Sequence, residues 1–312
     1  MFIPNFVSQK SLRMAIIADT FTFDCFAPEC DAVLLTPQNW MEVLRNGGID
    51  LLFVESVWIG KDNTWEHLRK LQSTVKCAEL IRVVDYARDR NVPSLFWNKE
   101  DPFHFSEFIT LAKKVDYVFT TDMGCVAKYK QILKHNDVYW LPFAAQPQLH
   151  NPTEEYDRIN GFCFAGAYYD RYPWRAEFLD KLINIKGEKE FAIYARKMQD
   201  GKISYPEKYH SFILGSLPYN EISRAYKGYN YGVNLNSMFY SCTMFARRVF
   251  ELLACGTVCV GNYSRGVKTL FGELVITTNS EQLLSEKISE LENTDKYSRA
   301  KQDGIELVFA EH

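Results

Sequence analysis

Short apolar runs alternate with amphipathic segments along the chain, and this alternation restricts the fold more than any other feature. In the first half, six runs predict strands, at 13–19, 32–36, 50–56, 92–98, 115–122 and 137–143. Helical windows lie between them, at 38–47, 65–91, 104–114 and 125–136. Strands that are apolar throughout are typical of a parallel sheet covered by helices on both faces. The first half therefore predicts a doubly wound α/β domain.

The same pattern restarts after residues 144–158, a segment rich in Pro, Asn and charge that we interpret as a linker. Further strands are predicted at 161–168, 190–196, 231–236, 257–262 and 273–277, and further helices at 172–187, 219–229, 245–256 and 280–312. The last helix has no clear cap, which leaves open that the chain is part of a longer protein. A chain of 312 residues exceeds one ordinary core. We predict two Rossmann-like domains, 1–148 and 149–312, that face each other across a cleft.

Composition limits the partners and the compartment. A net charge of −3 gives no field of the kind that binds nucleic acid. No window of about 18 apolar residues is present, so we expect no membrane-spanning segment, while peripheral contact with a membrane stays open. The 8 cysteines include no CxxC pair and several stand in apolar runs, which favours reduced thiols and a cytoplasmic protein.

The segment FARRVFELLACG, Phe245–Gly256, carries the strongest chemical signal. It follows a strand and a polar loop, with Thr243 as the expected helix cap and Arg247 and Arg248 in the first turn. Guanidinium groups pair with phosphate oxygens in a bidentate manner, so this pair predicts a diphosphate site. Glu251 lies on the same face, where a carboxylate can accept from ribose hydroxyls. A solvated Arg–Glu pair is the common alternative, but the apolar flanks favour the site.

Polar residues directly after other strands complete the candidate site, because parallel sheets bind ligands at the carboxyl ends of their strands. Further contacts with the ligand that carries the diphosphate are expected from Gly166, Arg196 and Asn236. The candidates for acid–base catalysis are Asp19, Glu55, Asp101 and His104. The residues expected to contact a second substrate, the acceptor of the reaction, are Trp58, Asn98, Lys99, Glu100 and Asp122.

Several well-known motifs are absent from the sequence. It contains no GxxxxGK[ST], HExxH, GxSxG or GxGxxG pattern, and the C-terminal half has no DxD-type metal motif. We therefore expect neither a bound metal nor a cofactor, and a nicotinamide dehydrogenase is disfavoured.

Six segments together resemble the GT-B glycosyltransferases, specifically the CgeB-like group: 53–60, 93–105, 116–122, 141–152, 162–171 and 242–261. The resemblance implies that the C-terminal domain holds a nucleotide-sugar donor and that the acceptor enters through the N-terminal one. Related retaining enzymes place two glutamates eight positions apart around the donor. Glu251 matches the second of these, but Thr243 stands at the first, which leaves the stereochemical outcome open. The resemblance also implies catalysis without a metal, in which arginines neutralise the leaving diphosphate.

The predicted activity is transfer of a sugar, of the hexosyl kind, from a nucleoside-diphosphate sugar such as a UDP-sugar to a hydroxyl group. The expected acceptor is a glycan or polyol phosphate in the synthesis of a bacterial surface glycan, such as capsule, teichoic acid or spore coat. Two alternatives stay open. A UDP-sugar epimerase of the same fold would consume donor without an acceptor, and a non-catalytic nucleotide-sugar-binding module of a larger polymerase would bind donor without releasing diphosphate.

Overall fold

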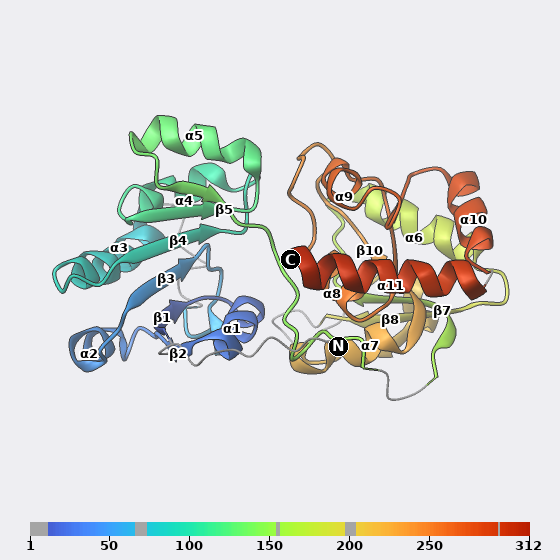
Figure 1. The fold of residues 1–312 in the computed structure, drawn as a ribbon, viewed down its shortest axis with the longest axis horizontal. Helices are drawn as coiled ribbons and strands as arrows, with labels where there is room; N and C mark the ends of the chain where they lie inside the picture. The colour runs from blue at the N-terminus through green and yellow to red at the C-terminus, as the bar shows by residue number, and fades with distance from the viewer. Residues whose placement is uncertain (1–11, 66–73, 154–156, 197–203, 293) are drawn as a thin grey trace. The chain divides into compact units, whose positions relative to one another are not determined.

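The computed structural model describes residues 12–65, 74–153, 157–196, 204–292 and 294–312. The chain divides into two compact units, Met1–Pro142 and Phe143–His312, which we call unit 1 and unit 2. Each unit is built around one six-stranded sheet with helices packed against it (Figure 1). The division falls a few residues before the boundary expected after residue 148.

Unit 1 contains a parallel sheet with the strand order β2-β1-β3-β4-β5-β6. Every strand predicted for this half forms. The strands are β1 (Arg13–Ile17), β2 (Asp31–Leu34), β3 (Leu51–Glu55), β4 (Ser94–Asn98), β5 (Tyr117–Thr120) and β6 (Val138–Trp140). The helices are α1 (Thr20–Phe26), α2 (Trp40–Asn46), α3 (Thr74–Arg88), α4 (Phe105–Ala112) and α5 (Met123–Leu133), with short 3₁₀ turns η1 (Ala27–Glu29) and η2 (Lys61–Asn63).

The core of unit 1 explains why these segments fold as they do. Val54 and Phe96 on the sheet are fully buried in one cluster with Val83 of α3, Leu111 of α4 and Tyr129 of α5. The sheet residues are apolar at successive positions because helices cover both faces. The helix α1 follows β1 where the sequence predicted none, and residues 66–73 of the predicted helix 65–91 lie outside the described part of the chain.

Unit 2 repeats the architecture, with the strand order β12-β11-β10-β7-β8-β9 and parallel pairing. Its strands are β7 (Ile159–Gly166), β8 (Glu190–Ala195), β9 (Ile213–Gly215), β10 (Tyr229–Asn234), β11 (Val258–Gly261) and β12 (Ile276–Thr277). Its helices are α6 (Pro173–Ile185), α7 (Ile222–Lys227), α8 (Arg248–Ala254), α9 (Arg265–Phe271), α10 (Glu281–Glu290) and α11 (Thr294–Glu311), with 3₁₀ turns η4 (Glu207–Phe212) and η5 (Tyr219–Glu221). The two parallel α/β sheets confirm the predicted fold class.

The helix α8 is buried inside unit 2. Phe250, Leu252 and Leu253 are 2% exposed or less. The helix lies between the sheet and α11, which runs across the unit in Figure 1 and brings Gly304 close to Leu253. This burial fixes the direction in which each polar side chain of α8 points.

Two local predictions for unit 2 need correction. Residues 280–312 form two helices, α10 and α11, rather than one. Thr243 does not cap α8, which begins only at Arg248 and has Arg247 in the N-cap position. Gly256 does adopt the predicted left-handed conformation, with a φ of 62°.

The segment 144–158 is more than a linker. Gln146 and His150 are buried within unit 2 at 2% and 0% exposure, and only residues 154–156 lie outside the described chain. As for membrane association, none of the described helices combines the length and the apolar character needed to cross a bilayer.

Candidate functional site

Each sheet has one switch point, where the strand order reverses and parallel α/β folds bind ligands at the carboxyl ends of the strands. In unit 1 the switch point lies between β1 and β3, because β1 leads to β2 on its other side. In unit 2 it lies between β7 and β10, because β7 leads to β8 on its other side. The two switch points differ in their chemistry.

The switch point of unit 1 is occupied by its own carboxylate. Asp19 follows β1, and its Oδ1 accepts hydrogen bonds from the backbone N–H groups of Ile59 and Gly60, at 3.1 and 2.8 Å. The N–H of Trp58 lies 3.3 Å from the same oxygen, and Lys99 Nζ lies 2.7 Å from Oδ2. Burial raises the pKa of Asp19, but Lys99 and these N–H groups outweigh burial and hold that pKa below its ordinary value. The backbone donors that could bind a phosphate here are already engaged.

Glu55 is fully buried next to Asp19. Its oxygens accept from the Asp19 N–H at 2.7 Å and from the Thr22 hydroxyl, and Lys99 Nζ lies 2.9 Å away. Burial raises the pKa of Glu55 above its ordinary value, and Lys99 offsets this only in part. Lys99 therefore joins two carboxylates inside unit 1, and its contact with an acceptor stays a prediction.

A second buried group surrounds Asp101, which has no exposed surface. Its Oδ1 accepts from Asn98 Nδ2 at 2.8 Å and its Oδ2 from the Thr120 hydroxyl at 2.6 Å. Burial raises the pKa of Asp101 to about 7, although Thr120 and Tyr129 donate to it. Asp101 and Glu55 have no exposed surface in this structure, and their role in acid–base catalysis stays a prediction.

His104 is the catalytic candidate with the best access. Its imidazole is 26% exposed, its Nδ1 lies 2.6 Å from Glu107 Oε1, and its ring packs edge-on against Trp58 at 5.1 Å between centroids. A carboxylate on one ring nitrogen orients the imidazole and leaves the other nitrogen for chemistry. Of the remaining residues expected at the acceptor, Glu100 is half-buried and Asp122 is buried at the start of α5.

The switch point of unit 2 is lined with arginines. The guanidinium of Arg248 lies against the end of β7, where a Cβ on Gly166 would come within 2.8 Å of its Nη2, and it stacks over Phe164 at 4.9 Å. Arg175 bridges the two loops that flank the switch point, with Nη2 donating to Ala167 O at 3.1 Å and Nη1 to Ser237 Oγ at 3.4 Å. Nε of both arginines is buried without a hydrogen-bond partner.

The charges of Arg175 and Arg248 are not neutralised by acids among the described residues. Within the described part of the chain, neither Arg175 nor Arg248 forms a salt bridge. Burial lowers the pKa of Arg175 to about 10, and the positive charges of Arg248 and Arg196 contribute to the shift. Arg196 and Arg175 also lie on the ring of Tyr169, at 6.0 and 4.8 Å. We call Arg175, Arg196 and Arg248 the arginine cluster.

Glu251 points away from the arginine cluster, although it stands only three positions after Arg248. It is 4% exposed, with Oε1 accepting from the Tyr219 hydroxyl at 2.7 Å and Oε2 from the Tyr226 hydroxyl at 2.9 Å. Burial raises the pKa of Glu251, but His150, Arg247 and the two tyrosines outweigh it, so the net pKa is below its ordinary value. Glu251 is therefore a buried carboxylate that stays ionised at neutral pH.

The remaining donor candidates serve the scaffold or lie beside it. Asn236 is 1% exposed and pairs reciprocally with Asn262, which ties the end of β10 to the end of β11. Thr243 is buried in a turn, where its N–H donates to Ser241 Oγ. Arg247 stacks over Phe143 at 4.9 Å, so the two adjacent arginines diverge instead of acting as a pair.

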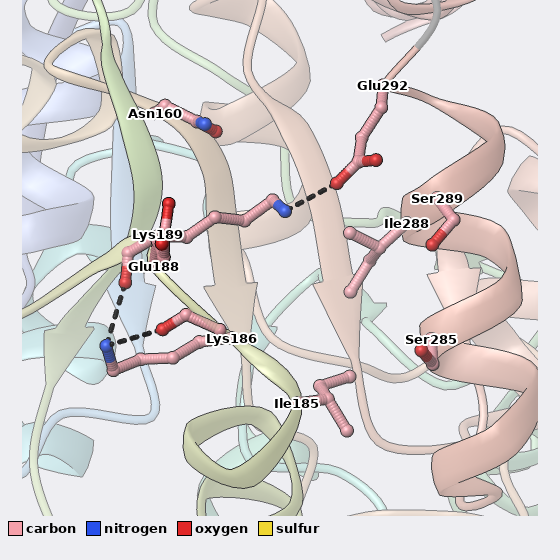
Figure 2. A pocket seen from close by; sticks show the side chains of 10 residues that line it. Asn160, Ile185, Lys186, Glu188, Lys189, Ser285, Ile288, Ser289 and Glu292 are labelled. Atoms are coloured by element: carbon pink, nitrogen blue, oxygen red, sulfur yellow. Dashed lines mark hydrogen bonds and ion pairs between the residues drawn. The ribbon is translucent and has the colours of Figure 1, made fainter.

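A hollow elsewhere on unit 2 does not compete with this site. It has a volume of about 310 Å³ and lies at the amino ends of β7 and β8, the edge opposite the arginine cluster. Lys189 Nζ lies 2.6 Å from Glu292 Oε1, and Lys186 Nζ donates to backbone carbonyls of its own loop. Dashed lines in Figure 2 mark these contacts. Both ammonium groups there have partners, so neither of them needs a ligand to satisfy it.

Sequence reasoning missed four residues of this region: Arg175, His150, Tyr219 and Tyr226. The only sequence signal for Arg175 was its place two residues into a helix after a strand-end glycine turn, where an arginine reads as a solvated charge. The other three come from segments far from α8 in the sequence. Nothing local could indicate that they converge on Glu251.

Comparison with known proteins shows what the chain is similar to. Residues 175–312 match the model of a family described as glycosyl transferase-like. The spore protein CgeB of Bacillus subtilis (strain 168) is 24% identical over 182 residues, a match that covers 54% of this chain and 56% of CgeB. The chain thus spans only about half the length of this curated relative.

Solved structures show the same fold. HepE from Anabaena, solved in complex with UDP and glucose, superposes with a TM-score of 0.60 at 14% identity, over 95% of this chain and 87% of HepE. Sucrose-phosphate synthase from Thermosynechococcus elongatus superposes with a TM-score of 0.56 at 12% identity, over 91% of this chain and 79% of the synthase. At these identities the likeness concerns the fold.

These observations give the chain the fold of the GT-B glycosyltransferases, and its residues 175–312 match the glycosyl transferase-like family. Within that class, the match to CgeB confirms the resemblance to the CgeB-like GT-B glycosyltransferases that the sequence motifs indicated.

Proposed function

We propose that this protein transfers a hexosyl group from a nucleoside-diphosphate sugar to a hydroxyl acceptor, and that unit 2 binds the donor. The observation that carries the proposal is the arginine cluster at the switch point of unit 2, where two guanidinium groups have buried Nε atoms without partners. Buried polar atoms in folded proteins almost always have partners. A diphosphate supplies acceptor oxygens and negative charge at this position.

The same cluster accounts for the chemistry of the leaving group. As the glycosidic bond breaks, negative charge grows on the diphosphate, and fixed positive groups in a partly buried site stabilise that charge without reorganising. Arg248 and Arg175 are held in place by Phe164, Ala167 and Ser237 before any substrate arrives. This arrangement supports the transfer without a metal ion that the sequence predicted.

Glu251 is proposed to accept from the ribose hydroxyls of the donor. It is ionised, and a carboxylate has acceptor capacity beyond the single hydroxyl that each oxygen receives here. HepE was solved with UDP and glucose, so UDP and UDP-hexoses are the first probes to use.

The acceptor is proposed to be a glycan or polyol phosphate of a bacterial surface polymer. If the reaction inverts the anomeric centre, a base must remove the acceptor proton, and His104 with its Glu107 partner suits this role best because it is accessible. If the reaction retains the configuration, the leaving diphosphate can take that proton, and His104 orients the acceptor.

The test combines binding and turnover. UDP binding to the wild type, Arg248→Ala and Glu251→Ala is measured by calorimetry, and UDP release from UDP-hexoses is followed with a panel of acceptors. We expect each substitution to weaken UDP binding by about tenfold or more, since each removes a charge-assisted hydrogen bond. Arg299→Ala, an exposed arginine of α11, is the matched control and should bind UDP like the wild type.

Two results would overturn the proposal. One is a wild type that binds no nucleoside diphosphate. The other is an Arg248→Ala variant that binds and turns over like the wild type. UDP-sugar consumed without any acceptor would instead favour an epimerase, and binding without release of UDP would favour a non-catalytic module.

A further inference from the structure

His150 has an unusual position in unit 2. It has no exposed surface, and it stands in the segment before β7 rather than on a strand or helix of the sheet. Its ring packs against both tyrosines that donate to Glu251, with centroid distances of 5.7 Å to Tyr219 and 6.4 Å to Tyr226. The imidazole thus faces the carboxylate proposed to bind the donor ribose.

The contacts of the ring determine where its proton is. Nδ1 lies 3.2 Å from the backbone N–H of Gln146, which donates to it. A ring nitrogen that accepts a hydrogen bond carries no proton, so a neutral His150 bears its proton on Nε2. Nε2 is buried, has no hydrogen-bond partner, and lies 3.9 Å from Oε1 of Glu251. This distance is too long for a hydrogen bond.

The charged surroundings favour the neutral ring. Burial lowers the pKa of His150, Glu251 raises it, and the cations Arg247 and Lys227 lower it again, so the net pKa is below its ordinary value. Tyr219 and Tyr226 are the other titratable groups at the ring, and burial raises the pKa of Tyr226 well above its usual range. The Nε2–H group of a neutral His150 therefore faces the negatively charged Oε1 of Glu251, 3.9 Å away.

An unpartnered N–H at this depth destabilises the free protein, and a phenylalanine would fill the same space without that cost. The cost is offset if the N–H is used in another state of the site. Donor binding supplies such a state, because ribose hydroxyls that approach Glu251 compete with the Tyr219 hydroxyl for Oε1.

We propose that His150 is a positioning residue of the donor site, whose Nε2–H closes on Oε1 of Glu251 when ribose binds and fixes the carboxylate in the orientation that accepts both ribose hydroxyls. This inference rests on the proposed function and adds a residue to it. His150 acts through Glu251 and does not touch the reacting atoms.

The experiment is a double-mutant cycle read out by UDP calorimetry. His150→Phe keeps the ring but removes the N–H, and we expect it to weaken UDP binding about tenfold, the usual size for a lost hydrogen bond to a charged group. His150→Gln keeps a donor near the Nε2 position and should bind within about threefold of the wild type. In a Glu251→Gln background, His150→Phe should cause no further loss, because the two residues act as one unit.

Two further measurements separate positioning from a structural role. The turnover number of His150→Phe with saturating UDP-sugar should stay near that of the wild type while KM rises. Protonation of His150 would place a second proton on Nδ1, facing the Gln146 N–H, and would displace the ring from this position. At acidic pH the affinity of the wild type for UDP should therefore fall more steeply than that of His150→Gln. If His150→Phe does not fold, this comparison of pH profiles decides the question by itself.

The inference is overturned if His150→Phe folds and binds UDP like the wild type, or if its loss adds in full to that of Glu251→Gln. Either result, with normal wild-type binding and a weakened Glu251→Gln, leaves the proposed function standing. A wild type without affinity for UDP or any other nucleoside diphosphate would refute the proposed function itself.

Discussion

At the scale of single residues, Lys99 shows how unit 1 uses buried charge. Its side chain is 11% exposed and bridges Asp19 and Glu55, at 2.7 and 2.9 Å. The two carboxylates raise the pKa of Lys99 despite its burial, so the ammonium stays charged. The attraction of such a group compensates for desolvation only while every member is present.

Replacing Lys99 should therefore destabilise the fold strongly. Lys99→Met leaves two buried carboxylates without their cation, and we expect the free energy of unfolding to fall by about 3–5 kcal/mol. Urea denaturation measures this loss. Adding Glu55→Gln removes one of the two stranded charges and should restore part of the stability.

Lys61→Met is the matched control for this prediction. Lys61 Nζ lies 2.6 Å from Asp24 Oδ1, with side chains 22% and 23% exposed. A more solvated pair contributes about 1 kcal/mol or less. A Lys99→Met variant that loses no more stability than Lys61→Met would show that the Asp19–Lys99–Glu55 group is not energetically coupled.

The sequence predicted some residues of the candidate site and not others for a physical reason. Arg248 and Glu251 could be identified because strand, polar loop and helix are local features that a short segment reveals. Lys99 was expected at an acceptor because it follows a strand, but its partners come from β1 and β3, and their proximity depends on strand order. Contacts between residues that are distant in the sequence cannot be predicted from a short sequence motif.

At the scale of elements, the close packing of α8 on β10 positions Arg248 and Glu251 together. Gly232 lies at the centre of β10, where an added Cβ would come 2.1 Å from Cδ2 of Leu252. Leu252 is fully buried, so it has little room to move. The glycine allows α8 to lie close to the sheet.

Gly232→Ala should consequently move α8 away from β10. We expect a loss of about 1–3 kcal/mol in the free energy of unfolding, the usual cost of overpacking a core. Weaker UDP binding should accompany it, because Arg248 and Glu251 move with the helix. Urea denaturation and calorimetry check the two effects.

A second substitution tests the cause. Leu252→Ala makes room for the added methyl group, so Gly232→Ala should destabilise a Leu252→Ala background far less than it destabilises the wild type. Equal losses in both backgrounds would mean that the contact with Leu252 does not set the position of α8.

The sequence predicted most of the strands correctly, since most are buried along their length. It did not predict the break within 280–312, where the surface that the helices pack against changes. Each strand predicted from an apolar run forms, since helices cover both sheet faces. The single helix expected over 280–312 is two helices, because its two halves pack on different surfaces: α10 against α6, and α11 against α8 and β11. Helix periodicity alone does not reveal such a change of partner.

At the scale of the whole molecule, two similar sheets carry opposite chemistry at their switch points. The backbone donors of unit 1 hold Asp19, whereas unit 2 presents the arginine cluster. Two parallel sheets were evident from the alternation of strands and helices. The strand orders, and with them this division between the units, depend on crossovers that the alternation does not specify.

The division predicts that unit 2 alone binds the nucleotide. Residues 143–312 form a compact unit with its own buried clusters, and they include the arginine cluster, Glu251 and His150. Expressed separately, this segment should fold cooperatively and bind UDP within about threefold of the whole chain. It should release no UDP from a UDP-hexose, because His104 and the expected acceptor contacts belong to unit 1. Arg248→Ala in the segment should weaken UDP binding as much as we expect in the whole chain, by about tenfold or more. A segment that folds, as judged by circular dichroism and thermal unfolding, but does not bind UDP would mean that donor binding requires residues of unit 1.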